Sequence, residues 1–382
     1  MEWVEQEETA PRLPPDLLVD LLREAAALPN AAPDASLRLG KALHDIGDTR
    51  GAIEILSRLT GIENDNAEAW RLRASMHLEL DDYQEALAAS ERGGASAAIL
   101  RARALIGLAR NDEAERLLRE MLAQDVHPAA FERLARLLAR QGRGEAVLEL
   151  CQARAGLPGC ATIGLAYCAL GLSLTRRDEE ARRIVDPERH VKQVSFDPPA
   201  ELGPIEQFNA GLAEQILRGQ RPAVREGLGI AYEPDRRRFP NLVPLYDFFR
   251  RELERYVGEL PQRGLDTVMP PAPHRVRLHS GATVLRMKGH HGDHFHPRGY
   301  VSCVYHVSVP GELSAAADLR GQLAIGTFDG LDRHCTPSWR TRHLRPQPGV
   351  LTIFPSHFFH NVVPTDIAAP RVSVAGDMEP VL

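Results

Sequence analysis

The chain of 382 residues contains very little lysine and few aromatic residues. Its only lysines are Lys41, Lys192 and Lys288, so nearly all of the positive charge is arginine, and the formal net charge is -6. A chain of this charge lacks the basic footprint that binding to nucleic-acid phosphates requires. We therefore expect no nucleic-acid partner.

Signals for export and for membrane insertion are also missing. No apolar run approaches the length of a membrane span, and the acidic start MEWVEQEETAPRLPPD lacks the basic and apolar parts of a signal peptide. The five cysteines are odd in number and have no CxxC spacing. These features predict a cytoplasmic protein with reduced thiols, without membrane attachment and without a cysteine metal site.

A repeated pattern occupies the amino-terminal half. An acidic or glycine-containing turn is followed by a small residue that opens a helix, and this unit recurs five times, at Ala52, Ala86, Ala114, Ala146 and Ala181. The spacings of 34, 28, 32 and 35 residues bracket the 34-residue period of tetratricopeptide repeats, which the segment resembles. Such helix pairs stack into a solenoid with a concave binding face.

The pattern changes at VSFDPPAELGP (194 to 204), where proline becomes frequent and helical periodicity stops. Amphipathic helices are expected at 205–220 and 242–260. Short β-branched segments follow at 282–287, 300–309, 322–328, 349–355 and 371–376, separated by glycine and proline turns. We expect an extension at 1–33, a tetratricopeptide-like domain at 34–198 and a β-domain at 199–382.

Histidines are concentrated in this β-region, which contains nine of the 15. In GDHFHPRGYVSCVYHV, His294 and His296 lie two residues apart just before a strand, so extended backbone directs both imidazoles to one face. His360 follows 64 residues after His296, at the end of PGVLTIFPSHFFH. Eleven residues later, strand alternation places Arg371 and Ser373 on one face, a pair that suits an anionic ligand.

These segments, with PRVSVAGDM at the end, resemble the 2-oxoglutarate- and Fe(II)-dependent oxygenases of bacteria, which often carry tetratricopeptide repeats in front. The resemblance covers residues 205–378. It implies Fe(II), 2-oxoglutarate and O2 as cofactor and co-substrates, with His294, His296 and His360 as metal ligands and catalytic residues. It also implies that Arg371, with Ser373 beside it, binds the distal carboxylate of 2-oxoglutarate, and that Tyr305 is a candidate for lining the same pocket.

The fold class implied is α+β multidomain: an all-α tetratricopeptide-like solenoid followed by a double-stranded β-helix, or jelly-roll, domain. One feature departs from the family pattern, because His296 stands where the usual site of two histidines and one carboxylate has an acidic residue. A rival interpretation restores the carboxylate by using His291 and Asp293, which form a His-x-Asp pair of their own. Asp293 could instead accept a hydrogen bond from a ligand imidazole.

The leading functional hypothesis is a dioxygenase that hydroxylates a peptide or protein side chain bound by the helical repeats. Two alternatives remain open: a small-molecule hydroxylase whose repeats mediate assembly, and a non-catalytic adaptor with a degenerate metal site. The histidine at position 296 favours the adaptor, whereas Arg371 and Ser373 oppose it. Formation of succinate in the presence of Fe(II) and 2-oxoglutarate would separate the enzymes from the adaptor.

Overall fold

A computed structural model describes residues 1–4, 15–28, 32–218, 230–232, 241–287, 289–328, 330 and 333–381. The chain divides into two compact units, one formed by Glu8–Leu137 and the other by Met1–Glu7 together with Leu138–Leu382. No helix within these described ranges is both long enough and apolar enough to span a bilayer.

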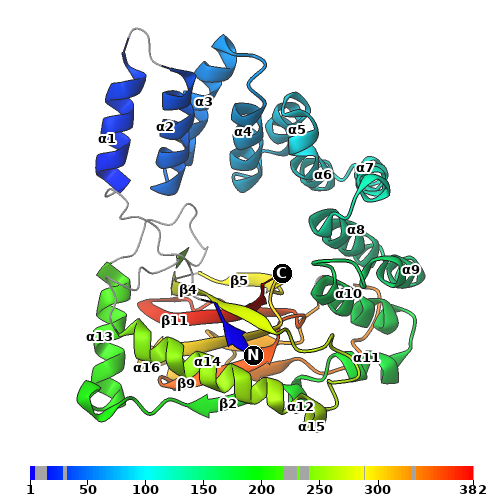
Figure 1. Ribbon diagram of the computed structural model, residues 1–382, viewed down its shortest axis with the longest axis vertical. Helices are drawn as coiled ribbons and strands as arrows, with labels where there is room; N and C mark the ends of the chain where they lie inside the picture. Colours follow the sequence, from blue (N-terminus) through cyan, green and yellow to red (C-terminus); the bar gives the residue numbers. More distant parts are fainter. Residues whose placement is uncertain are drawn as a thin grey trace. The chain divides into compact units, whose positions relative to one another are not determined.

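The first unit is built from antiparallel helix pairs (Figure 1). Its helices are α1 (Pro15–Ala26), α2 (Pro33–Asp45), α3 (Thr49–Ile62), α4 (Ala67–Glu79), α5 (Tyr83–Arg92), α6 (Ala98–Gly107), α7 (Asn111–Gln124) and most of α8 (Pro128–Arg140), with a 3-10 turn η1 (Gly94–Ala97). The acidic turn residues Asp48 and Asp82 cap α3 and α5 by accepting a backbone N–H three residues ahead. The helical first half is therefore confirmed.

In four of the five repeats, the alanine expected to open the second helix is fully buried, as close helix packing requires. In the fourth repeat, however, the expected Ala146 is only partly buried. In the other four repeats, the buried residue is the fourth after the residue that precedes the helix. In the fourth repeat that position is Val147, four residues after Arg143. The buried set is therefore Ala52, Ala86, Ala114, Val147 and Ala181, each with no exposed surface, and the irregular spacings of 32 and 35 residues become 33 and 34.

The second unit begins with the last repeat helices and continues into the β-domain. Its helices are α9 (Gly144–Arg154), α10 (Ala161–Leu174), α11 (Asp178–Ile184), α12 (Pro187–His190), η2 (Ala200–Leu202), α13 (Ile205–Arg218), α14 (Leu242–Gly258), α15 (Leu260–Arg263) and α16 (Gly311–Ser314). The proline-rich segment near residue 198 lies between β2 (Lys192–Ser195) and α13, whereas the compact units divide earlier, between residues 137 and 138.

The strands form two sheets, which bears out the expected order of a helical-repeat region and a β-domain. The larger sheet has the order β1 (Glu2–Trp3), β4 (Arg275–Met287), β11 (Ile367–Pro380), β6 (Val301–Ser308), β9 (Val350–Pro355), β2 (Lys192–Ser195), with β3 (Ile230–Tyr232) also paired to β4. The smaller sheet has the order β5 (His291–His294), β10 (His360–Val362), β7 (Leu323–Ile325), β8 (Arg342–Leu344). All pairs are antiparallel except β1 with β4.

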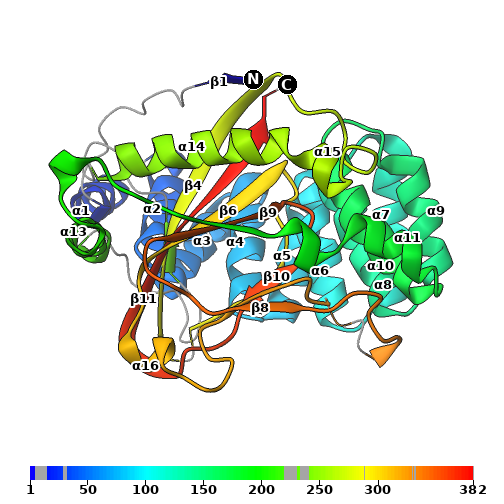
Figure 2. The ribbon, with the colours of Figure 1, turned by 90° about the horizontal axis from the view of Figure 1, so that it is seen from below.

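The two faces of the larger sheet differ in character. Val372, Val374 and Met378 of β11 lie in an apolar core with residues of α13 and α14, and Figure 2 shows α14 crossing the strands on this side. Because side chains alternate along a strand, Arg371, Ser373 and Asp377 point to the opposite face. The helices thus cover one side of the sheet and leave the other side for the polar residues.

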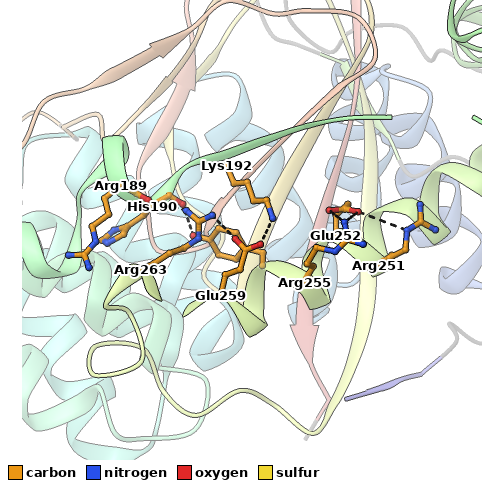
Figure 3. Close-up of polar contacts among 9 residues, drawn as sticks. Arg189, His190, Lys192, Arg251, Glu252, Arg255, Glu259 and Arg263 are labelled. Atoms are coloured by element: carbon orange, nitrogen blue, oxygen red, sulfur yellow. Dashed lines mark hydrogen bonds and ion pairs between the residues drawn. The ribbon is translucent and has the colours of Figure 1, made fainter. Parts of the chain in front are cut away.

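Residues 190–192, which lead into β2, are tied to α14 and α15 by polar contacts (Figure 3). Glu259 accepts hydrogen bonds from both Lys192 and Arg263, and the Arg263 guanidinium lies 4.8 Å from the centre of the Tyr256 ring. The Tyr256 hydroxyl donates to the backbone carbonyl of His190. Residues 190–192 are therefore held against α14 and α15 within the second compact unit.

Candidate metal centre

Three histidines from two strands of the smaller sheet converge at one point. His294 ends β5, and His296 follows two residues later with its ring stacked at 5.3 Å between centroids. His360 opens β10 and pairs directly with His294 in the ladder, which brings their ring centroids to 4.2 Å. One nitrogen of each ring lies within 4.8 Å of the others. The structure thus brings together the three predicted ligands.

Each of these imidazoles is held through its Nδ1 atom. His294 Nδ1 lies 2.8 Å from the Gly292 carbonyl oxygen, and His360 Nδ1 lies 3.0 Å from the Phe358 carbonyl oxygen. A carbonyl oxygen can only accept, so Nδ1 carries the proton and donates it. His296 Nδ1 likewise faces a carboxylate. In the neutral form of each ring the lone pair is then on Nε2, the atom that a metal would bind.

Asp377 supplies the carboxylate that the HxH pair lacks. Both of its carboxylate oxygens lie 2.6 Å from His296 Nδ1, and the Ser302 hydroxyl donates to Oδ1 at 2.6 Å. Burial opposes protonation of His296, but the charge and hydrogen bond of Asp377 outweigh burial and raise its pKa above the ordinary value. The resulting carboxylate–histidine pair is the usual support of a metal-binding imidazole. Sequence analysis did not identify Asp377.

The other two imidazoles have lowered pKa values. Burial, followed by the neighbouring His296, lowers the pKa of His294, and burial with both neighbours holds the pKa of His360 well below its usual range. Neutral imidazole is the form that binds a metal ion. At neutral pH, His294 and His360 are therefore already in the neutral form and need not lose a proton before they bind a metal.

Arg371 lies on β11 with only 1% of its surface exposed. Its polar neighbour in the described part of the chain is His306, whose Nδ1 is 3.5 Å from Arg371 Nη2. Neither Arg371 Nε nor His306 Nε2 has a hydrogen-bond partner among the described residues. Ser373 is also buried and pairs with His306 across the β6–β11 ladder. Arg371, Ser373 and His306 therefore form a buried polar group in which no acidic side chain of the described residues pairs with the guanidinium.

Tyr305 is not part of that group. It pairs with Val374, so it faces the apolar side of the sheet, where it packs between Phe196 and Phe249. Its hydroxyl donates to Asn209 Oδ1 at 2.7 Å. The structure places this sequence candidate away from Arg371 and Ser373, and places His306, which the sequence analysis did not select, beside them.

The rival pair, His291 and Asp293, is separated by a β-bulge. Three steps along β5, from His291 to His294, match two steps along β10, from Val362 to His360. The extra residue brings His291 onto the face of His294, with ring centroids 5.8 Å apart. Asp293 instead accepts a hydrogen bond from Asn361 at 2.7 Å. Because Asn361 adjoins His360 on the strand, it points to the other face, and Asp293 is directed away from the three converging rings.

Comparisons with known proteins agree with this arrangement. Residues 280–377 match the family described as "Putative 2OG-Fe(II) oxygenase", and residues 19–76 match the tetratricopeptide repeat. No curated protein matches the sequence. The resemblance drawn from the sequence is thus confirmed by both family models, which match an oxygenase domain of this description and a tetratricopeptide repeat.

Solved structures of both types resemble parts of the chain at low identity. A Pseudomonas putida prolyl-4-hydroxylase is 18% identical over 52% of this chain and 96% of its own, with a TM-score of 0.35. A tetratricopeptide repeat protein from Parabacteroides merdae is 17% identical over 44% of this chain and 69% of its own, with a TM-score of 0.39. YrrB, another tetratricopeptide repeat protein, is 13% identical over 44% and 89%, with a TM-score of 0.36.

Proposed function

We propose that this protein is a 2-oxoglutarate- and Fe(II)-dependent dioxygenase that hydroxylates a side chain of a peptide or protein held by its helical repeats. The observation that supports the proposal most strongly is the presence of two features in one β-domain. Three converging imidazoles have free Nε2 atoms, and a buried arginine has no carboxylate partner in the described part of the chain. The first suits a divalent metal and the second a dicarboxylate.

His294, His296 and His360 would hold the metal through Nε2. Iron sites of this class usually contain one carboxylate as a direct ligand. Here Asp377 would balance the metal charge from the far side of the His296 ring, because it is buried and hydrogen-bonded to Nδ1. A carboxylate in that position also raises the basicity of the ligand imidazole. The donor set therefore fits a divalent metal.

Arg371 and Ser373 would hold the distal carboxylate of 2-oxoglutarate. Burial lowers the pKa of Arg371 to about 10, so its guanidinium is still charged at neutral pH. A buried cation without a counter-charge is strongly destabilising, and the Nε donor of Arg371 has no acceptor among the residues that the structure describes. A carboxylate that accepts two parallel N–H hydrogen bonds would satisfy both the charge and the donor.

The chemistry that metal and co-substrate supply in this class is oxidation of a C–H bond to C–OH, coupled to conversion of 2-oxoglutarate and O2 to succinate and CO2. Arg371 would fix the orientation of the co-substrate. Phe354, with its ring edge-on to His360 at 4.8 Å between centroids, would keep that side of the centre apolar. A peptide substrate is favoured because tetratricopeptide repeats form extended surfaces that bind polypeptide segments.

The proposal is tested by measuring succinate formation by the full chain with Fe(II), 2-oxoglutarate and O2, with His360→Ala as the inactive control. We expect slow turnover without substrate and faster turnover with a peptide that gains one oxygen atom. An absence of succinate under all conditions would favour the adaptor. A chain that lacks residues 8–127 but keeps Met1–Glu7, which belongs to the compact unit of the β-domain, should keep the slow turnover but show a raised KM for the peptide. An unchanged KM would favour the small-molecule hydroxylase.

A further inference from the structure

Helix α10 (Ala161–Leu174) belongs to the repeat pattern by sequence but to the β-domain unit by packing. Its sequence ATIGLAYCALGLSL contains no charged residue, and buried residues occur around its whole circumference. A helix that is apolar on all sides must be enclosed by other elements. One part of that enclosure is the pair of segments that carry the three converging histidines.

Tyr167 makes the central contact between α10 and those segments. Its fully buried ring lies edge-on to Phe295 at 5.8 Å and to Phe359 at 5.7 Å between centroids. Phe295 stands between His294 and His296, and Phe359 immediately precedes His360. The two phenylalanines also contact each other at 5.0 Å. One tyrosine therefore packs against the neighbours of all three histidines.

Two hydrogen bonds place the same helix independently of the aromatic cluster. Near its start, the Thr162 hydroxyl donates to the Gly299 carbonyl oxygen at 2.9 Å, and the Gly299 N–H in turn donates to the His296 carbonyl oxygen at 3.0 Å. Near its end, Ser173 and Ser338 are hydrogen-bonded at 2.7 Å. The ring of Tyr167 is thus held in place along the helix axis on both sides.

We propose that Tyr167 is a positioning residue for the metal centre, so that the repeat helix α10 helps to hold the three histidines in place. The inference rests on the proposed function, because it takes the three histidines to be metal ligands. Side chains on opposite faces of a short extended segment move together, since the backbone between them is shared. A ring that fixes Phe295 and Phe359 therefore fixes the relative placement of His294, His296 and His360.

The test compares Tyr167→Leu and Tyr167→Phe in the full chain, with Co(II) as the probe metal. Tyr167→Leu removes the edge-on contacts and should weaken Co(II) binding about tenfold, the lower end of the effect of outer residues on metal sites. It should also change the visible absorption spectrum of bound Co(II), which reports the ligand geometry. Tyr167→Phe keeps the ring and should retain wild-type affinity and spectrum. Phe131→Leu is the matched control, since Phe131 is an equally buried ring in the other compact unit.

The outcomes separate this inference from the proposed function. A wild-type protein that binds no divalent metal would overturn both. Wild-type Co(II) affinity and spectrum in Tyr167→Leu would overturn the positioning role alone, as would equal losses in Phe131→Leu. If Tyr167→Leu does not fold, Phe295→Leu tests the same contact from the other side. An unchanged Co(II) spectrum and affinity in that variant would also contradict the proposal.

Discussion

Asp377 offers the sharpest test of how a three-histidine centre balances the charge of its metal. Replacement by Asn keeps an oxygen that can accept from His296 Nδ1 but removes the negative charge, and replacement by Ala removes both. A hydrogen bond to a charged group is worth about 1.5–3 kcal/mol. At 1.36 kcal/mol per tenfold change, this energy corresponds to an approximately 10- to 150-fold loss of metal affinity. Because only 9% of Asp377 is exposed, solvent does little to screen it.

We expect the dissociation constant for the metal to rise about tenfold in Asp377→Asn and by up to about 150-fold in Asp377→Ala, from the same hydrogen-bond energy. The measurement is competitive titration of Co(II) against a chelator of known affinity, with thermal unfolding of the metal-free protein to check the fold. Glu379→Gln is the matched control, because Glu379 is a buried carboxylate on the same strand that binds Arg277. Equal affinities in the wild type and Asp377→Ala would refute the reasoning.

Three further predictions concern the rest of the site and its surroundings. Arg371→Ala should raise the dissociation constant for 2-oxoglutarate about 10- to 150-fold, since it removes a charge-assisted pair, and should leave metal affinity nearly unchanged. The measurement is anaerobic titration of the Fe(II) protein with 2-oxoglutarate, and equal affinities in the variant and the wild type would contradict the prediction. His291→Gln and Asp293→Asn should each leave Co(II) affinity within about threefold of wild type if neither residue is a ligand. A loss of Co(II) affinity as large as that in His294→Gln would instead favour His291 and Asp293 as the metal ligands. Burial lowers the pKa of His357 to about 4, whereas its value in the unfolded chain is 6.5. The unfolded state therefore binds more protons between these two pH values. As the pH decreases from 7.5 to 5, this residue should lower the free energy of unfolding by about 2 kcal/mol. Denaturant titration of the metal-free protein at both pH values should show a smaller decrease in His357→Gln, and an equal decrease would contradict the assignment.

The convergence of the three histidines could be predicted because it follows from local sequence patterns. His294 and His296 are two residues apart in extended backbone, so their common direction follows from strand geometry alone. His360 and Arg371 lie at the ends of recognisable strands, and the resemblance to a known family related them to the pair. None of these steps required knowledge of which strands are neighbours in a sheet.

The residues that sequence analysis missed or misplaced depend on pairing between distant strands. Asp377 reaches His296 across 81 positions of sequence, and His306 faces Arg371 across 65. Tyr305 could not be placed either, because only the β6–β11 register, which pairs it with Val374, assigns it to the apolar face. A shift of one residue in that register would exchange the two faces of the strand.

The domain boundary illustrates the same limit at a larger scale. The prolines between 194 and 204 lie between β2 and α13, because proline interrupts the local backbone pattern, and helices as well as strands follow them. Compactness depends instead on which surfaces are buried together. Before that segment, Tyr167 already packs against Phe295 and Phe359, and β2 (Lys192–Ser195) pairs with β9 of the larger sheet. A cut at residue 198 would therefore remove an edge strand and expose the apolar back of the histidine segments, so the repeats cannot be treated as an attachment that ends where the helices end.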